Sequence, residues 1–306
     1  MSGSNDEPRR YAIDGQGFTA QPLPGGLYIV STPIGNLRDI TIRALQTLAA
    51  ADIIACEDTR TTRVLLRHYG LSGQLIAYHE HNAAEQRPRI LEALEAGRSL
   101  ALVSDAGTPL ISDPGYRLVA DVSAAGHPVI PIPGASAILA GLVAAALPTD
   151  AFFFAGFLPT RTVGRKKRIA ALAAVPGTLV FYESPHRTAE TLADLAETLG
   201  PERPATMARE LTKTFETHRR GTLGSLAAEL AGEADPKGEI VIMVGPPEAG
   251  VAEPGDVDAL LLRLLSGHPV KEAAQQAAAQ TGLPRRDLYQ RALALKEGDG
   301  GDDGAT

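Results

Sequence analysis

The sequence has a single cysteine, Cys56, so an internal disulfide framework is excluded and a reducing cytosol fits the chain. No run approaches 18 uncharged apolar residues, so no transmembrane helix is predicted. Residues 1–10, MSGSNDEPRR, lack the apolar segment of a secretory signal. We therefore expect a cytoplasmic protein that does not bind a membrane.

Basic residues are the minority, with 29 Lys and Arg against 36 Asp and Glu and a net charge of −7. This balance argues against a general nucleic-acid coat, although a local basic site remains compatible with it. Hydrophobic residues make up 44% of the 306 residues, which excludes disorder throughout because such a chain can bury a sizeable core. The length suits two domains.

Short, continuously apolar segments alternate with helical patterns in the first half of the chain. The expected strands are residues 27–30, 52–56, 74–78, 99–103 and 129–131. Continuous apolar strands are typical of a parallel sheet that helices cover on both faces. The pattern predicts an α/β domain over residues 24–147, with ligands at the carboxyl ends of its strands.

The pattern breaks at residues 147–150, which we interpret as a linker. A second α/β domain is predicted over residues 151–246, with strands at 152–155, 178–182, 205–208 and 240–244. Three short helical segments over residues 255–297 contain a turn at 281–284 that resembles a helix-turn-helix connection. The predicted fold is thus two α/β/α domains and a small C-terminal helical module. A flexible tail at 1–23 and an acidic tail at 298–306 complete the chain and carry no functional signal.

Three Gly- and Pro-rich loops follow strands of the first domain. The loop at 31–36 is neither a Walker A loop nor G-x-G-x-x-G, so a ligand cradle and an ordinary turn fit equally. The segment 104–115 combines two Asp with several Gly and Pro, and here a ligand role is favoured over two capped turns. Residues 133–136, PGAS, open a helix whose N–H groups face beyond the sheet, and Ser136 also suits a simple helix cap.

Two charged motifs, at 182–187 and 209–213, end strands of the second domain and are expected to share one edge of its sheet. Glu183 and His186 suit proton transfer, and an ion pair and a helix cap are the structural alternatives. Ser184 lacks a G-x-S-x-G elbow, which argues against a Ser–His hydrolase. No metal site is predicted at Tyr78-His79-Glu80-His81, because the spacing is not H-E-x-x-H and no third ligand cluster joins it.

One basic cluster lies in residues 160–168, which contain no acid. A solvated helix start is one interpretation. A phosphate contact is the favoured one, because like charges repel one another unless a counter-charge binds. The cluster consists of Arg161, Arg165, Lys166, Lys167 and Arg168.

Seven motifs, in order and with fitting gaps over about residues 25–297, resemble those of bacterial tetrapyrrole-methylase-like ribosomal RNA methyltransferases. They are YIVSTPIGNLRDI (28–40), EDTR (57–60), YHEHN (78–82), SDAGTPLISDPG (104–115), PGAS (133–136), YESPHR (182–187) and RELTK (209–213). The resemblance implies two α/β domains that bind S-adenosylmethionine in the cleft between them, and a homodimer. It implies 2′-O-methylation of the ribose of a decoding-site cytidine in small-subunit (16S) ribosomal RNA of the 30S subunit.

The resemblance also implies a set of functional residues. The cofactor pattern of the family falls on Ile34, Asp105, Thr108, Ser136, Ala137, Tyr182, Ala208 and Glu239. Because a ribose 2′-hydroxyl is a weak acid, a base or hydrogen-bond acceptor is useful, and Glu183 and Glu210 are the candidates. Arg187 and Lys213 are candidates for holding a phosphate or lowering the pKa of the hydroxyl. Alignment without any protein base is the alternative mechanism.

Three other functions compete with this interpretation. A tetrapyrrole methylase shares the fold and the cofactor, but it does not need the basic cluster or the C-terminal helical module. A diphthamide-type protein methylase fits the loops less well. A ribosome-binding assembly factor that senses the cofactor without catalysis is the candidate from a different class.

Overall fold

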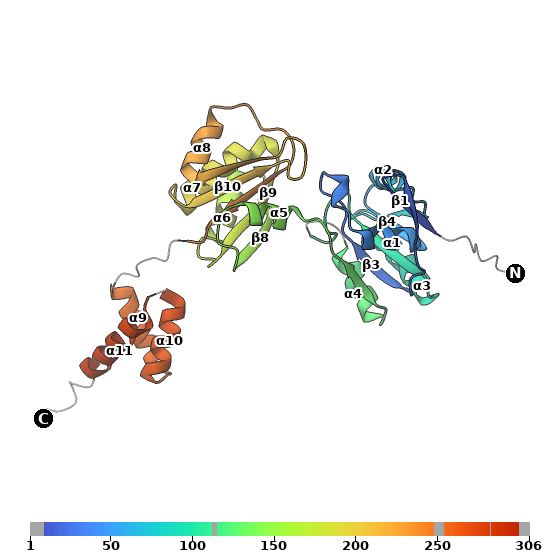
Figure 1. Cartoon of the computed structure of the whole chain (residues 1–306). Coiled ribbons are helices and arrows are strands. Elements are labelled where there is room, and N and C mark those ends of the chain that lie inside the picture. The colour runs from blue at the N-terminus through green and yellow to red at the C-terminus, as the bar shows by residue number, and fades with distance from the viewer. Residues whose placement is uncertain (1–8, 112–114, 248–253, 282, 300–306) are drawn as a thin grey trace, which may run out of the picture. The chain divides into compact units, whose positions relative to one another are not determined.

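The computed structural model describes residues 9–111, 115–247, 254–281 and 283–299 (Figure 1). The chain divides into two compact units. The first unit, residues 1–173 and 177–245, contains both α/β domains. The second unit consists of residues 174–176 and 246–306 and contains the C-terminal helices.

The first sheet is parallel and has five strands in the order β5-β4-β6-β3-β7. Its strands are β3 (Gly26–Val30), β4 (Ile53–Cys56), β5 (Leu75–Ala77), β6 (Ser99–Val103) and β7 (Val129–Ile132). They lie where the apolar runs predicted them, and β3, β4 and β6 are buried throughout. Burial on both faces explains why these strands show no alternation of apolar and polar residues.

Helices cover both faces of this sheet. On one face, α1 (Ile42–Ala50) and α2 (Thr59–His68) pack against alternate strand residues such as Val30 and Ile54. On the other face, α3 (Ala83–Glu95) and α4 (Tyr116–Ala124) pack against Leu27 and Leu100. The side chains of Thr41 and Asp58 cap α1 and α2 by accepting backbone N–H groups. The domain is therefore a three-layer α/β/α sandwich, as predicted.

An N-terminal hairpin replaces part of the expected flexible tail. Its strands, β1 (Arg10–Ile13) and β2 (Gln16–Thr19), pair antiparallel, and Tyr11 is only 4% exposed within the core under α1. Asp14 and Gly15 form the turn with φ values of 48° and 82°, the left-handed geometry of a two-residue hairpin. The prediction of a flexible tail is wrong for these residues, and residues 1–8 lie outside the described part.

The second sheet is mixed, with strand order β11-β10-β12-β9-β8. Its strands are β8 (Phe152–Phe157), β9 (Thr178–Glu183), β10 (Pro204–Arg209), β11 (Thr217–Thr222) and β12 (Ile240–Val244). β8 pairs parallel with β9, whereas β12 runs antiparallel to both β9 and β10. β9 and β10 consequently end at the same edge of the sheet. β11 was not predicted, since its sequence THRRGT has no apolar periodicity.

Helix α5 (Ala137–Ala144) falls within the predicted first domain, yet it packs against the second sheet. Ile138 and Leu142 contact the face that carries Val180, Val241 and Met243. The predicted boundary at residue 147 is therefore corrected, because the first-domain chain contributes a layer to the second domain. Three further helices complete the domain: α6 (Thr162–Ala170), α7 (Thr188–Leu199) and α8 (Leu223–Ala231).

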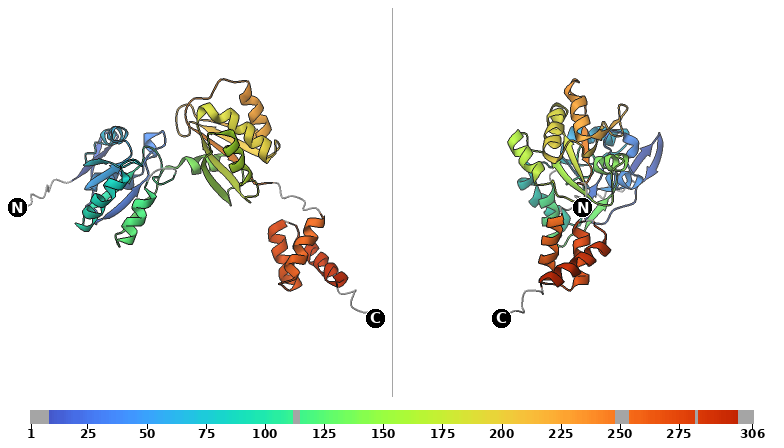
Figure 2. Two further views of the ribbon diagram at one scale, coloured as in Figure 1. Left: turned by 180° about the vertical axis from the view of Figure 1, so that it is seen from behind. Right: turned by 90° about the vertical axis from the view of Figure 1, so that its left-hand side faces the viewer.

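The C-terminal unit is a cluster of three helices with its own small core (Figure 2). They are α9 (Pro254–Leu265), α10 (Val270–Thr281) and α11 (Arg285–Asp299), close to the predicted segments. Leu261, Ala274 and Leu288 are buried where the three helices meet. Within the residues described, no helix has both the length and the apolar character to span a bilayer.

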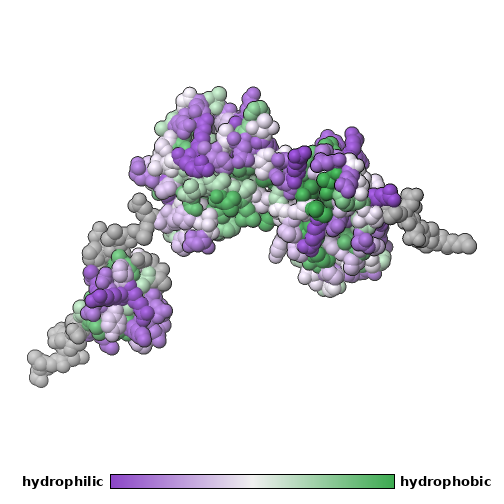
Figure 3. All heavy atoms as spheres, in the orientation of Figure 1, coloured by the Kyte–Doolittle hydropathy of each residue, from purple (hydrophilic) through white to green (hydrophobic). Residues whose placement is uncertain are grey.

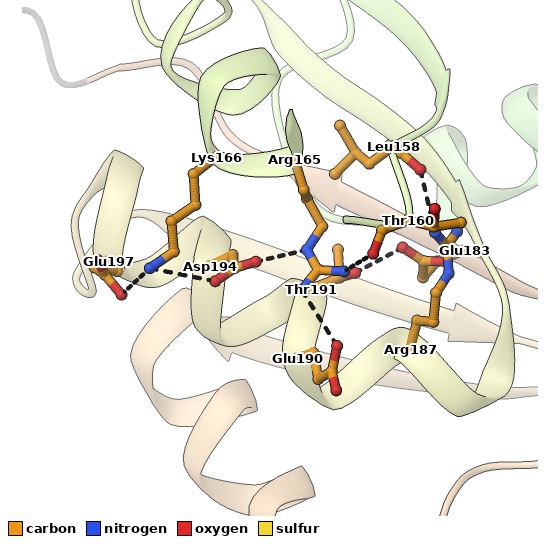
Figure 4. A network of polar contacts seen from close by, with 10 residues as sticks. All are labelled: Leu158, Thr160, Arg165, Lys166, Glu183, Arg187, Glu190, Thr191, Asp194 and Glu197. Carbon is orange, nitrogen blue, oxygen red and sulfur yellow. Dashed lines mark hydrogen bonds and ion pairs between the residues drawn. The ribbon is translucent and has the colours of Figure 1, made fainter. Parts of the chain in front are cut away.

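An ion-pair network centred on a buried arginine joins α6 to α7 (Figure 4). The Arg165 side chain is 1% exposed, and its Nε lies 2.5 Å from Oδ2 of Asp194 and its Nη2 3.3 Å from Oε2 of Glu190. Lys166 pairs with Glu197 at 2.7 Å and lies 3.6 Å from Asp194. A buried charge is tolerated only when it is paired, so Arg165 and Asp194 depend on each other.

Replacing Arg165 tests this network. Arg165→Ala leaves the nearly buried Asp194 carboxylate without its main partner, and we expect the free energy of unfolding to fall by about 3 kcal/mol. Lys167→Ala is the matched control, because Lys167 is exposed on the same helix, and it is expected to change stability by less than ~0.5 kcal/mol. Urea unfolding monitored by circular dichroism measures both. Equal stability of the two variants would contradict the structural role of Arg165.

Candidate active site

Three loops at the carboxyl ends of β3, β6 and β7 are joined to one another. Thr32 and Gly107 form an antiparallel backbone pair, with N···O distances of 2.9 and 3.1 Å. The hydroxyls of Ser31 and Thr108 lie 2.9 Å apart, and Thr108 Oγ1 donates to the Ala135 carbonyl at 3.3 Å. Gly107 has φ +78°, which favours glycine. The loops therefore form one platform.

A cavity of about 390 Å³ lies over this platform and is closed by the second domain. The first domain contributes Ile34, Thr108 and the start of α5, and the second contributes the ends of β8 and β9 and the start of β12. Its lining residues are Ile34, Ala106, Gly107, Thr108, Ile111, Ser136, Ala137, Phe157, Tyr182, Glu183, Ser184, Pro185, Gly238, Glu239, Ile240 and Val241. Both domains are thus needed to make the site.

Six of the eight predicted cofactor residues line this cavity: Ile34, Thr108, Ser136, Ala137, Tyr182 and Glu239. Asp105 is not among the lining residues. Its carboxylate accepts the N–H of Asp58 at 3.1 Å and so joins the loops after β6 and β4. Ala208 is fully buried in β10 beside Val241, so it packs beneath the cavity and is not in its wall.

The two charged motifs of the second domain lie at one edge of its sheet, as predicted. Glu183 at the end of β9 is in register with Ile240, and Ile240 is in register with Arg209 on β10. The start of β12 therefore lies between the two motifs. This register places Glu239, the residue before β12, next to Glu210.

Glu183 is 3% exposed, and its carboxylate has partners at both oxygens (Figure 4). Oε1 accepts from the Ser184 N–H at 2.7 Å and from Arg187 Nη2 at 2.5 Å, and Oε2 accepts from Thr191 Oγ1 at 2.6 Å. Arg187 also donates to the Leu158 carbonyl at 3.2 Å. The cluster fixes the end of β9 against the loop after β8.

Lys213 connects the second charged motif to the cavity rim. Its Nζ donates to Glu210 Oε1 at 2.7 Å and to Glu239 Oε2 at 3.0 Å. Glu210 also accepts the backbone N–H of Glu239 at 3.1 Å. Gly238 has φ +93°, which favours glycine, and a Cβ there would lie 2.2 Å from Glu210 Oε1. Lys213 also packs against Gly35 of the first domain, where a Cβ would lie 2.4 Å from its Cγ.

This arrangement keeps both charges at neutral pH. The hydrogen bond from Lys213 lowers the pKa of Glu210 despite partial burial. Burial alone lowers the pKa of Lys213, but hydrogen bonds to Glu210 and Glu239 outweigh it and raise the pKa above its usual value. Glu210 is therefore a weak proton acceptor, and Lys213 is a persistent cation.

The basic cluster does not present all five of its side chains to solvent. Arg165 is buried, so the prediction that it contacts RNA is wrong, and Lys166 is paired with Glu197. The sequence pattern missed the counter-charges because they lie on α7. Arg161, Lys167 and Arg168 are exposed.

Several lining residues escaped the sequence analysis. Phe157 reaches the cavity because of an irregularity in β8 between Phe154 and Gly156, which no sequence pattern indicates. Gly238 lies against the Glu210 side chain with φ +93°, and neither the contact nor this backbone conformation is indicated by the sequence pattern. In the described ranges there is no group of three or more His, Cys, Asp or Glu side chains arranged to hold a metal ion.

Family models match most of the chain. The tetrapyrrole (corrin/porphyrin) methylase model matches residues 26–227, and the RsmI C-terminal HTH domain model matches residues 251–296. Ribosomal RNA small subunit methyltransferase I of Mesorhizobium japonicum is 58% identical, covering 92% of this chain and 97% of the relative. The protein of the same name from Pseudomonas aeruginosa is 46% identical, covering 88% and 97%.

Solved structures agree on the fold. A diphthine synthase matches with a TM-score of 0.57 at 15% identity, covering 72% of this chain and 89% of that chain. Uroporphyrin-III C-methyltransferase from Thermus thermophilus, complexed with S-adenosyl homocysteine, matches with a TM-score of 0.51 at 22% identity, covering 72% and 97%. At 15% and 22% identity, these two structures support the fold alone. The chain belongs to the tetrapyrrole methylase family, in the branch whose curated relatives are named ribosomal RNA small subunit methyltransferase I.

Proposed function

We propose that this protein uses S-adenosylmethionine to methylate small-subunit ribosomal RNA in the 30S subunit, at the ribose 2′-hydroxyl of a decoding-site cytidine. The observation that carries the proposal is the position of Lys213, a cation that lines an open basin and pairs with Glu239 in the wall of the cavity. The names of the relatives, at up to 58% identity over almost their whole length, support ribosomal RNA as the substrate. The fold does not distinguish between substrates, since a uroporphyrin-III C-methyltransferase and a diphthine synthase share it.

The cavity fits the proposed cofactor. Its volume of about 390 Å³ lies in the range of small-molecule sites, roughly 300–1,000 Å³. Apolar side chains such as Ile34 and Tyr182 suit an adenine ring, and Thr108 and Glu239 add polar groups. When bound, S-adenosylmethionine supplies a methyl group on a sulfonium leaving group. The task of the chain is then to hold and orient the acceptor.

An open basin beside Lys213 suits the acceptor strand. It is about 1260 Å³ in volume and is lined by the N-terminal hairpin, by η1 (Leu37–Asp39) with its flanking residues, and by residues 212–214. Arg38 and Lys213 bring positive charge to its wall, and Asp14 brings a carboxylate that can accept a hydrogen bond from a hydroxyl group. A ribose-phosphate backbone offers both the anion and the hydroxyl groups that such a wall binds.

These contacts favour alignment and electrostatic stabilisation over a protein base. Glu183 is engaged at both oxygens, and we assign it, with Arg187, to positioning the end of β9. Glu210 orients Lys213. The Lys213 ammonium stabilises negative charge that develops on the ribose oxygen or holds the adjacent phosphate, and it is the catalytic residue of the proposal.

A second surface supports a dimer. β8 is an edge strand that exposes Phe152, Phe153 and Phe157, and α5 exposes Leu139 and Val143. Figure 3 shows apolar surface over this part of the second domain. An uncovered apolar edge strand pairs readily with another chain. We propose that two copies associate through this surface.

The reaction itself is tested with radiolabelled S-adenosylmethionine and small ribosomal subunits that lack the modification. We expect label in the 16S RNA, at one cytidine whose 3′ phosphodiester bond resists alkali. Porphyrin precursor serves as the competing substrate. Label in the porphyrin alone, or binding of subunits without any transfer, would contradict the proposal.

The role of Lys213 predicts a pH effect. Lys213→Met should lower kcat about a hundredfold, the usual loss for one charge-stabilising donor. Glu210→Gln removes a group that raises the pKa of Lys213, so the ammonium is lost at lower pH and the alkaline limb of the rate profile moves down. Glu197→Gln, far along α7, is the control. An unshifted alkaline limb in Glu210→Gln would refute this role.

The exposed part of the basic cluster is expected to contact RNA phosphates. Changing Arg161, Lys167 and Arg168 together to Ser should weaken subunit binding and reduce the slope of log K against log salt by about 2. The affinity for S-adenosylmethionine should not change. Lys166→Ser is the control, because acidic side chains already neutralise Lys166. An unchanged salt slope in the triple variant would exclude this surface.

The dimer is tested by sedimentation. Val143 is 77% exposed, so Val143→Glu costs no core packing, and we expect it to convert a dimeric protein to a monomer. Val64→Glu, at an exposed position of α2, should leave the dimer intact. A wild-type monomer, or a Val143→Glu dimer, would rule out this interface.

A further inference from the structure

A separate cavity of about 760 Å³ lies in the first domain, where β4 and β5 end. Residues 78–81, the His-rich motif that the proposed function leaves unused, form one wall. The first turn of α4, with Tyr116 and Arg117, forms a second wall. Arg87 of α3 lies in a third. This cavity shares no lining residue with the cavity of about 390 Å³ proposed above for S-adenosylmethionine, called the cofactor cavity below.

The walls of this cavity are held by specific contacts. The Asn82 side chain accepts the His79 N–H at 2.8 Å and donates to the Ala77 carbonyl at 2.9 Å, which fixes the loop after β5. Arg87 is anchored by Asp121 at 3.2 Å. Gly115 has φ +135°, and a Cβ there would lie 2.5 Å from Leu110 Cδ2, so only glycine lets the chain turn into α4 here.

The lining groups remain partly unsatisfied. Tyr116 is 78% exposed, although tyrosine is intermediate in burial in folded proteins. Arg117, His81 and Glu80 line the cavity, and no ion pair of these side chains lies within the described ranges. Glu57 and Glu80 also line the cavity, so it offers hydrogen-bond acceptors as well as cations. A ligand with an aromatic face, polar edges and an anionic group matches this set.

The position of the cavity relates it to the reaction. Both cavities lie at the carboxyl edge of the same parallel sheet, and β5 is three strands from β3. At about 4.8 Å per strand, β5 and β3 lie about 14 Å apart, whereas β4 and β6, whose end loops line the one and the other cavity, are adjacent. The Asp105–Asp58 hydrogen bond connects the loops between them. An RNA strand whose acceptor nucleotide lies at the cofactor cavity can therefore reach this site with a neighbouring nucleotide.

We propose that this cavity binds a nucleotide of the substrate RNA that flanks the methylated one, with its base stacked on Tyr116 and its phosphates near Arg87 and Arg117. The inference rests on the proposed function for the identity of the RNA. Stacking on an aromatic ring tolerates any base, whereas the charged groups fix the backbone. The site thus sets the register of the strand and does not act on the reacting atoms.

Equilibrium binding of unmethylated small subunits tests the site without requiring turnover. Tyr116→Ala should weaken binding about tenfold, within the range measured for loss of one base stack, and Tyr116→Phe should restore it because the ring alone is needed. Arg117→Ala should weaken binding and reduce its salt dependence. Arg89→Ala is the control, because Arg89 is an exposed cation on α3 that does not line the cavity. Affinity for S-adenosylmethionine should be equal in all variants.

The outcomes separate this inference from the proposed function. Unchanged subunit binding in a Tyr116→Ala, Arg117→Ala double variant overturns the site, whatever the catalytic activity. Equal loss in Tyr116→Ala and Tyr116→Phe also overturns it, because stacking then is not the interaction. If subunits bind through Tyr116 but the wild-type protein transfers no methyl group to them, the site stands and the proposed reaction fails.

Discussion

The backbone pair between Thr32 and Gly107 is the contact on which the site depends. It holds the loop after β3 against the loop after β6. The hydrogen bonds between Ser31 and Thr108 and from Thr108 to the Ala135 carbonyl add the loop after β7. Parallel strands deliver these loops to one edge, but they do not by themselves connect them. Together these contacts hold the three loops as one platform, and the cavity lies over that platform.

The second domain completes the site through two further constraints. α5 follows the platform loop after β7 and packs against one face of the second sheet, which connects the two domains. Lys213 then reaches back to Gly35, so the charged loop after β10 lies against the loop after β3. Since Glu210 and Thr212 adopt positive φ, this loop holds a conformation that non-glycine residues seldom take. Such conformations persist only where the surroundings enforce them, and they are common at functional sites.

Local patterns were enough to predict the first sheet, because apolar runs as short as those of β3 and β6, each followed by turn residues, are typical of buried strands. The strand-end loops could be predicted as a site because parallel strands bring their carboxyl ends to one edge. β11 could not, because antiparallel pairing with β10 stabilises a strand that is polar throughout. The hairpin was missed although Asp14-Gly15 is a turn signal. Its strands are stabilised by packing of Tyr11 into the core of the first domain, a contact that the local sequence does not indicate. Arg165 was misassigned because its partner Asp194 lies on another helix.

The most direct test of the account is a crystal structure of the protein with S-adenosylhomocysteine. We expect the ligand to occupy the cavity between the platform and the second sheet, in contact with Thr108, Ala137 and Tyr182. We also expect Lys213 to lie at the open side of the occupied cavity. Ligand density at any other place, with this cavity empty, would contradict the central claim.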